Sequence, residues 1–228
     1  MLTIAHRGAA SLAKDNTLEA FQLALSHGTD MIETDLRLTA DGLFVLSHLP
    51  FVWKGLFPRR IATLSYHEVQ EIAPENITVQ QLLQNVPRDL SIMLELRLDT
   101  RATYVRNLVE TVASHQCIFS SVYTSRLSFI RSLLPNGDFC LILGPRMIMP
   151  RYIPPPWIRS CIVNYYVASG SVVQMLKREG LRIFLSHVES LKQAQRALAL
   201  KVDGVLTGDP CLVRRAKVGG PESCECAR

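Results

Sequence analysis

Short apolar runs alternate with helix-length amphipathic stretches along most of this sequence, and the alternation limits the folds that the chain can adopt. Runs of this length are typical of buried strands, and the stretches between them are long enough for the crossover helices that parallel strands need. Asn16 is predicted to cap the first of these helices. We expect eight strands, at residues 2–5, 31–36, 91–96, 118–121, 139–143, 161–164, 181–185 and 203–206. Eight strand–helix units predict an α/β fold, a (β/α)₈ TIM barrel, with a doubly wound open sheet as the alternative.

The alternation is interrupted once, after the second strand. The turn at residues 39–42 leads into the apolar run 43–47 too directly for a crossover helix, which predicts a small hairpin. A less regular segment follows before the next strand begins. We therefore expect a single domain over residues 1–218, with an insertion at about 37–90, and a flexible C-terminal tail over 219–228.

Composition narrows the class of protein further. The chain is 48% hydrophobic and 20% charged, so it can bury a large core, which excludes a disordered protein. Its longest apolar runs fall far short of the roughly 20 residues that cross a bilayer. The net charge of +5 is scattered along the chain. Such a charge suits an anionic ligand or an acidic membrane surface and is too diffuse to indicate nucleic acid.

The cysteines and the N-terminus bear on location. Most of the six cysteines lie in apolar runs, which favours buried free thiols over disulfides. Residues 1–5 lead directly into polar His6 and Arg7, unlike a signal peptide. These features predict a reducing, cytoplasmic location. No feature of the sequence indicates a particular oligomeric state.

Acidic residues lie on the predicted strands near the ends at which barrel enzymes carry their active sites. Because side chains alternate along a strand, Glu33 and Asp35 share one face, and Glu95 shares a face with Arg97. If these faces point inward, three carboxylates meet and repel one another unless protons or a divalent cation are present. Oxygen ligands suit Mg²⁺ or Ca²⁺ better than zinc, so we expect one of these ions as cofactor. Ordinary solvent-facing residues or ion pairs are the alternative.

Basic residues accompany the acidic ones. His6 ends the first strand and His48 ends the hairpin, and near-neutral imidazoles can take a proton from a nucleophile and give one to a leaving group. Arg7 and Arg97 supply fixed positive charge in a geometry that suits phosphate. Together with a metal ion, these residues predict cleavage of a phosphodiester. His187 ends the seventh strand, and its role is ambiguous.

The same residues lie in segments whose order and spacing match a known family. The segments are residues 5–8, 15–21, 32–36, 45–48 and 202–207, and more weakly 94–97. They resemble the glycerophosphodiester phosphodiesterase family of (β/α)₈ barrels. Arg97 stands where that family usually has lysine.

The resemblance implies a role for each candidate residue. It assigns acid/base catalysis to His6 and His48, phosphate contact to Arg7 and Arg97, and binding of Ca²⁺ or Mg²⁺ to Glu33, Asp35 and Glu95. The implied reaction is hydrolysis of a small-molecule glycerophosphodiester to glycerol 3-phosphate and an alcohol. In the family the attack is attributed to the substrate's own glycerol hydroxyl, so no serine or cysteine nucleophile is needed.

Departures from the family pattern leave other functions open. Leu49 follows His48 where the family has aspartate, and residues 186–189 replace a Trp-Thr-Val-Asn motif. The alternatives are lysophospholipase D-type activity on lysophospholipids, or a catalytically weakened pseudoenzyme that binds phosphodiesters or a membrane. Apolar and basic residues at 51–60 and 146–159 are expected either to form a lip that contacts a lipid tail or an anionic membrane, or to pack on the barrel rim.

Overall fold

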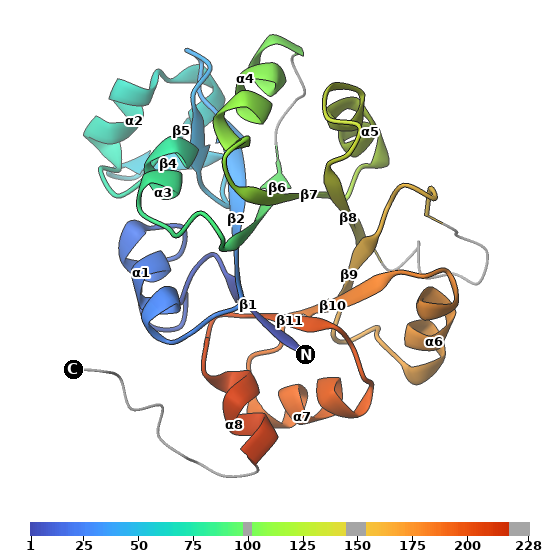
Figure 1. The fold of residues 1–228 in the computed structure, drawn as a ribbon. Helices are drawn as coiled ribbons and strands as arrows, with labels where there is room; N and C mark the ends of the chain where they lie inside the picture. The colour runs from blue at the N-terminus through green and yellow to red at the C-terminus, as the bar shows by residue number, and fades with distance from the viewer. Residues whose placement is uncertain (98–101, 145–153, 219–228) are drawn as a thin grey trace.

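A computed structural model describes residues 1–97, 102–144 and 154–218, and in it eight parallel strands close into a barrel surrounded by helices (Figure 1). The strands are β1 (Leu2–His6), β2 (Met31–Leu38), β6 (Ser91–Leu96), β7 (Gln116–Ser121), β8 (Asp138–Leu143), β9 (Ser160–Asn164), β10 (Arg182–Ser186) and β11 (Gly204–Thr207). Neighbours pair in chain order, and β1 pairs with both β2 and β11. The sheet has therefore no open edge among these strands, which confirms the (β/α)₈ barrel and excludes the open sheet.

Helices cover the outside of the barrel. They are α1 (Leu18–Ser26), α3 (Val79–Gln84), α4 (Ala102–Val112), α5 (Thr124–Leu133), α6 (Gly170–Arg178), α7 (Leu191–Ala199) and α8 (Leu212–Val218). These helices bury apolar side chains in the main core, as α6 does with Val173 and Leu176. The main hydrophobic core lies between the helices and the outward faces of the strands.

The start of α1 differs from the prediction. Thr17, not Asn16, is the N-cap, and its hydroxyl accepts a hydrogen bond from the backbone N–H of Ala20 at 3.3 Å. Asn16 instead has a left-handed backbone with φ +58° and turns its side chain toward β2. Asparagine tolerates this conformation better than most residues.

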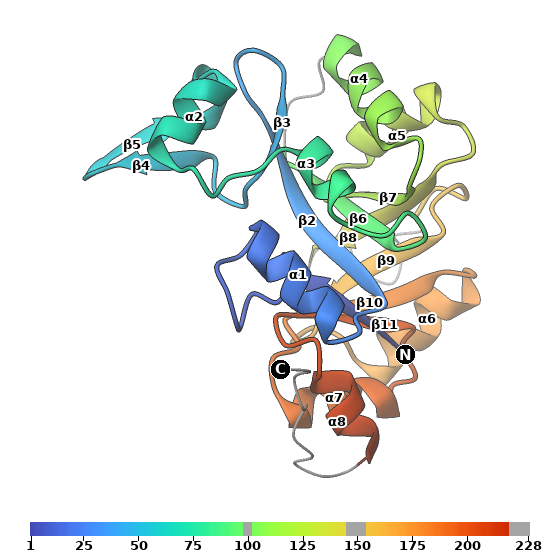
Figure 2. The same ribbon diagram turned by 60° about the vertical axis from the view of Figure 1, so that its left-hand side comes forward.

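The insertion after β2 contains the expected hairpin and a second one. β3 (Phe44–Leu46) pairs antiparallel with β2. β4 (Phe51–Lys54) and β5 (Phe57–Arg60) then form a separate two-stranded sheet, which projects away from the barrel and the N-terminus (Figure 2). A 3₁₀ turn (Ile61–Thr63) and α2 (Tyr66–Ile72) follow. The second hairpin was not predicted, because its strands are short and mix apolar residues with charges and a proline.

Apolar side chains fill the part of the barrel interior that lies nearer the amino ends of the strands than the candidate site residues do. One residue from each strand contributes to this layer, namely Ile4, Met31, Met93, Ile118, Cys140, Ile162, Phe184 and Leu206. Alternation then directs the residue two positions further along each strand into the barrel as well. In β1, β2 and β6 those residues are His6, Glu33 and Glu95, so the apolar layer forms the floor beneath the polar strand ends.

The structure also bears on the expected free cysteines and on the expected absence of a membrane-spanning segment. Cys117, Cys140 and Cys161 are free thiols, as expected for cysteines in apolar runs, whereas Cys211 is disulfide-bonded. Within the described ranges, no helix is long and apolar enough to cross a membrane. A cytoplasmic location stays a prediction.

For the second stretch, residues 146–159, either a surface lip or packing on the barrel rim was expected, and the structure describes only residues 154–159 of it. Residues 146–153 of that stretch, like the predicted tail 219–228, lie outside the described residues. Trp157 packs edge-on against Phe139, with ring centroids 5.6 Å apart, and joins the main core. Of the two alternatives for this stretch, Trp157 therefore follows the second, packing on the barrel, because its ring has apolar partners inside the fold.

Candidate active site

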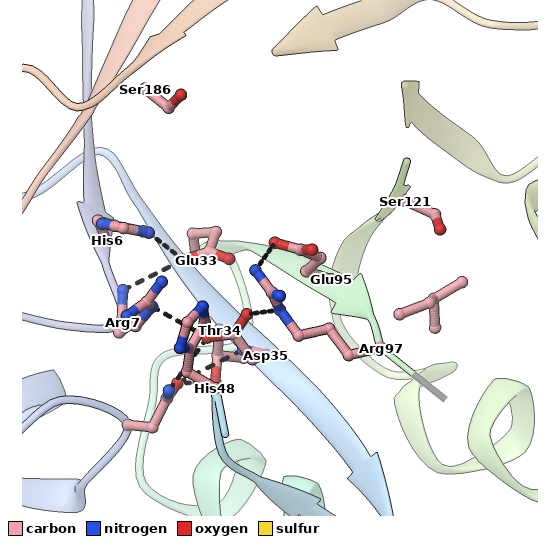
Figure 3. A network of polar contacts seen from close by, with 12 residues as sticks. His6, Arg7, Glu33, Thr34, Asp35, His48, Glu95, Arg97, Ser121 and Ser186 are labelled. Atoms are coloured by element: carbon pink, nitrogen blue, oxygen red, sulfur yellow. Dashed lines mark hydrogen bonds and ion pairs between the residues drawn. The ribbon is translucent and has the colours of Figure 1, made fainter. Parts of the chain in front are cut away.

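The predicted carboxylates meet at the carboxyl ends of β2 and β6 (Figure 3). Strand register places His6 beside Glu33 and Asp35 beside Glu95. Glu33, Asp35 and Glu95 each offer an oxygen, and the three oxygens lie within 4.8 Å of one another. Barrel closure has therefore brought together residues that are up to 62 positions apart in the sequence.

The environment gives these carboxyl groups different pKa values. Burial raises the pKa of Glu33 well above its usual range, and the charges of Asp35 and Glu95 add to this. Burial also raises the pKa of Glu95, with Arg97 acting against it. Burial alone would raise the pKa of Asp35 too, but Arg97 and Arg7 outweigh it and hold that pKa below its usual value. Glu33, only 1% exposed, is the carboxyl whose charge is least compensated.

Two guanidinium groups hold Asp35 from opposite sides. The Nε of Arg7 lies 3.0 Å from Oδ2 of Asp35 as an ion pair, without the alignment of a hydrogen bond. Arg97 donates from Nε to Oδ1 of Asp35 and from Nη2 to Oε2 of Glu95, the latter at 3.1 Å. Arg7 also donates from Nη1 to Asp15 at 3.3 Å. Both positive charges are thus fixed beside the carboxylate cluster, and both groups line the same pocket.

A tight turn after β1 sets the position of Arg7. Arg7 has φ +58°, and its backbone N–H donates to the carbonyl of Glu33 at 2.9 Å and to the Glu33 carboxylate at 3.2 Å. Gly8 follows with φ +82°, where a Cβ would lie 2.7 Å from the backbone of Ala20. Glycine is required here for both conformation and space.

Both predicted histidines border the cluster. The Nε2 of His6 lies 3.9 Å from the Oε2 of Glu33. Burial, with help from Arg7, lowers the pKa of His6 from 6.5 to about 4. Burial and Arg7 also lower the pKa of His48. Both imidazoles are therefore mainly neutral at pH 7 in the protein alone, which is the form that accepts a proton.

Two pockets adjoin His48. The first, of about 400 Å³, contains most of the predicted site, with His6, Arg7, Glu33, His48, Glu95 and Arg97 among its lining residues. The second, of about 370 Å³, lies against the insertion and is lined in part by Asp15, Leu49, Phe51, Trp53 and Glu75. His48 lines both pockets and so lies between them.

Sequence reasoning missed Asn16 as a site residue. Its Nδ2 donates to Oδ2 of Asp35 at 3.2 Å, and its Oδ1 accepts from the hydroxyl of Thr34 at 2.7 Å. The prediction that Asn16 caps the helix hid this role. The sequence did offer a signal: Thr17, directly after Asn16, can also cap a helix, which would leave the side chain of Asn16 free for another role.

Arg37 was missed as well. It follows Glu33 and Asp35 at the next alternate position of β2 and lines the first pocket. Its Nη1 donates to the carbonyl of Arg97 at 2.8 Å, and its Nη2 donates to the carbonyl of His48. The same alternation rule that identified the two carboxylates would have identified Arg37.

The departures from the family pattern have visible consequences. Leu49 is exposed and lines the second pocket. Ser186 and His187 line the first pocket, and their Oγ and Nδ1 atoms lie 3.0 Å apart. Glu189 accepts a hydrogen bond from the backbone N–H of Gly208 at 3.1 Å. Of residues 186–189, Ser186 and His187 thus give this pocket polar side chains, while Val188 is buried in the main core.

Comparison with known proteins connects this arrangement to one family. Residues 6–212 match the model of the glycerophosphoryl diester phosphodiesterase family. A glycerophosphodiester phosphodiesterase of Bacillus altitudinis is 27% identical over 232 residues, which cover 90% of this chain and 94% of that protein. One of Caldanaerobacter subterraneus is 22% identical over 240 residues, covering 96% and 99%.

Solved structures share the fold. An Oleispira antarctica phosphodiesterase in complex with the product sn-glycerol-3-phosphate superposes with a TM-score of 0.80 at 20% identity, covering 96% of this chain and 97% of that one. A glycerophosphodiester phosphodiesterase from Thermotoga maritima has a TM-score of 0.75 at 22% identity, covering 96% and 98%.

Proposed function

This chain belongs to the glycerophosphoryl diester phosphodiesterase family, and we propose that it hydrolyses glycerophosphodiesters to glycerol 3-phosphate and an alcohol, using a divalent cation and the imidazoles of His6 and His48. The observation that carries the proposal is the cluster of three carboxylates beside a pocket that two arginines and both histidines line. The names of the relatives support the same reaction.

The donor set fits a divalent cation. Glu33, Asp35 and Glu95 supply oxygen atoms only, which suits Mg²⁺ or Ca²⁺. The raised pKa of buried Glu33 marks negative charge that the arginines do not fully compensate, and a cation held by the three residues would compensate it. Bound there, the ion would stabilise negative charge on the phosphate and favour ionisation of the attacking hydroxyl.

The two arginines would orient the substrate. Arg7 and Arg97 keep their charges at the edge of the cluster through ion pairs with Asp35, and both line the first pocket. A phosphate placed against them receives fixed N–H donors and positive charge. Arg97 also donates a hydrogen bond to Glu95, so its guanidinium group is held by two carboxylates and has little freedom to move.

The histidines would divide the proton transfers. One imidazole would accept the proton of the attacking glycerol hydroxyl, and His6, which is neutral at pH 7 and lies beside Glu33, is in the form that can do so. His48 lies between the two pockets, where a departing alcohol would leave. The negative charge of a bound phosphate would raise the pKa of His48 and so favour the protonated form that a donor needs.

A lysophospholipid is the second candidate substrate, with lysophospholipase D-type cleavage. Leu49, Phe51 and Trp53 favour it, because they place apolar side chains in the second pocket within reach of His48. A soluble diester needs no such surface. The smaller substrate remains our first choice because both predicted catalytic histidines and both predicted phosphate-binding arginines line the first pocket.

Parallel assays test both candidates. Glycerophosphocholine and lysophosphatidylcholine would each be offered to the purified protein with Mg²⁺, with Ca²⁺ and with EDTA, and released choline and glycerol 3-phosphate measured. We expect turnover of glycerophosphocholine that EDTA abolishes. Turnover of lysophosphatidylcholine alone would select the second candidate. Ion binding without turnover of either substrate would instead indicate a phosphodiester-binding pseudoenzyme.

A further inference from the structure

The tip of the β4–β5 hairpin exposes large apolar side chains. Leu56 is 89% exposed, Phe57 74% and Trp53 57%. Gly55, with φ +62°, occupies the first position of a two-residue turn, which lets the two strands reverse tightly. Figure 2 shows the hairpin projecting from the body of the molecule, so no other described element covers its tip.

The base of the hairpin is firmly held. Val52 is 4% exposed and packs with Val45, Ile61, Leu64 and Val69 in a small core of its own. Alternation along β4 therefore fixes Phe51 and Trp53 on the opposite face. The apolar tip is thus presented by a rigid support, and clustered exposure of this kind marks a surface that binds something.

The positive charge of the hairpin indicates the chemistry of the partner that it binds. Lys54, Arg59 and Arg60 are all exposed, and residues 49–60 contain no acidic residue. Outside the hairpin, Glu68 of α2 has its pKa lowered chiefly by hydrogen bonds from Ser65 and in part by the charge of Arg59. An apolar tip with a basic rim complements an anionic bilayer, whose acyl chains are apolar and whose headgroups carry negative charge.

The hairpin also adjoins the candidate active site. Phe51, Val52 and Trp53 line the second pocket together with His48. A bilayer that receives the tip of the hairpin would therefore lie close to that pocket. A second copy of this chain or another protein would have to supply acidic groups around an apolar surface, and no observation favours either.

We propose that the β4–β5 hairpin docks this protein on anionic membranes, with Leu56 and Phe57 inserted at the boundary between headgroups and acyl chains and Lys54, Arg59 and Arg60 against lipid phosphates. The proposal goes beyond the catalytic function and does not depend on it. An inactive Glu95→Gln variant is expected to bind membranes as the wild type does.

Vesicle flotation of the full chain in EDTA tests the proposal. Vesicles of phosphatidylcholine with phosphatidylserine are compared with vesicles of phosphatidylcholine alone. We expect at least about tenfold stronger partitioning onto the anionic vesicles, weakened by salt. The double variant Leu56→Ser/Phe57→Ser should lose about tenfold in partitioning. The triple variant Lys54→Gln/Arg59→Gln/Arg60→Gln should lose the preference for anionic lipid.

Matched controls separate the hairpin from general charge and hydrophobicity. Arg88→Gln/Arg178→Gln/Lys201→Gln removes three exposed charges outside the hairpin, and Val218→Ser removes an exposed apolar side chain at the end of α8. Both controls should bind as the wild type does. Unchanged melting temperature and unchanged hydrolysis of glycerophosphocholine would show that the hairpin variants are folded.

Trp53 provides a readout that needs no hairpin variant. Its fluorescence should shift to shorter wavelength on anionic vesicles, while Trp157, already packed in the core, contributes a constant background. Equal partitioning onto both kinds of vesicle, or hairpin variants that bind as well as the wild type, would overturn the proposal. A protein that does not float but forms a dimer broken by Leu56→Ser would also overturn it, and would identify a second copy as the partner.

Discussion

Asn16 donates a hydrogen bond to Asp35 over 3.2 Å, and it does so from a backbone in the left-handed region. Both residues are buried. The contact ties the segment between β1 and α1 to the carboxylate that also receives Arg7 and Arg97. Asp35 therefore has fixed partners on both of its oxygens, and its orientation does not depend on a bound ion alone.

Replacing Asn16 should separate the hydrogen bond from the backbone conformation. Asn16→Gly keeps the left-handed backbone without strain but removes the donor to Asp35, at a cost of about 1–3 kcal/mol. Asn16→Ala removes the donor and also adds about 1 kcal/mol of strain at φ +58°. Urea unfolding measures both. If the two variants are as stable as the wild type, the hydrogen bond contributes nothing.

Removing either candidate catalytic imidazole should reduce turnover while leaving the fold intact. His6→Ala and His48→Ala are each expected to lower kcat at least about 100-fold, because general acid/base catalysis typically contributes this much or more. His67→Ala, on the exposed side of α2, is the matched control and should retain full activity. A fully active His48→Ala variant would remove His48 from the acid/base assignment.

Divalent ions should stabilise the protein, and more strongly at higher pH. The pKa of Glu33 is raised in the folded state, so its contribution to stability is fully present below the unfolded value near 4.5 and is lost as pH rises through the raised pKa. A bound ion would offset that loss and would compete with the proton. At 100 times its Kd, Mg²⁺ or Ca²⁺ should add about 2.7 kcal/mol, or roughly 5–10 °C in Tm.

Thermal shift assays at mildly acidic and mildly alkaline pH measure this effect. Glu33→Gln should lose both the ion-dependent shift and the Glu33 part of the pH dependence. A shift of equal size in Glu33→Gln would place the ion elsewhere.

The turn after β1 should not tolerate a side chain at Gly8. Gly8→Ala combines a backbone at φ +82° with a Cβ only 2.7 Å from the backbone of Ala20. Gly180→Ala is the matched control, because Gly180 has φ +74° but no atom within 4 Å of the added Cβ. We expect Gly180→Ala to cost about 1–2 kcal/mol and Gly8→Ala about 1–3 kcal/mol more. Equal costs in chemical denaturation would show that the loop around Gly8 adapts freely.

Local pattern was sufficient for the strands and for the faces of their side chains. Alternation along β2 places Glu33 and Asp35 on one face whatever the rest of the chain does, and alternation along β6 does the same for Glu95. The short turn before β3 likewise predicted an antiparallel hairpin. These features depend on residues that are near one another in sequence.

Other features came only from the tertiary structure. The role of Asn16 depends on Asp35, which lies 19 positions further along the chain. The exposure of Leu56 depends on the absence of any described element over the tip of its hairpin. Neither could be read from local residue types, because both depend on which distant segments lie nearby.

The sequence by itself determined the order of strands and helices and which side chains share a face of a strand, because backbone periodicity and apolar burial act over a few residues. Closure of the sheet into a barrel became clear only from the pairing of β1 with β11, which joins the two ends of the chain. Only the tertiary structure decided how far apart those side chains lie and what charge each one has. The register between β1, β2 and β6 sets the distances. Burial and neighbouring charges then raise the pKa of Glu33 and lower that of His6, since electrostatic free energies depend on position in space rather than on order along the chain.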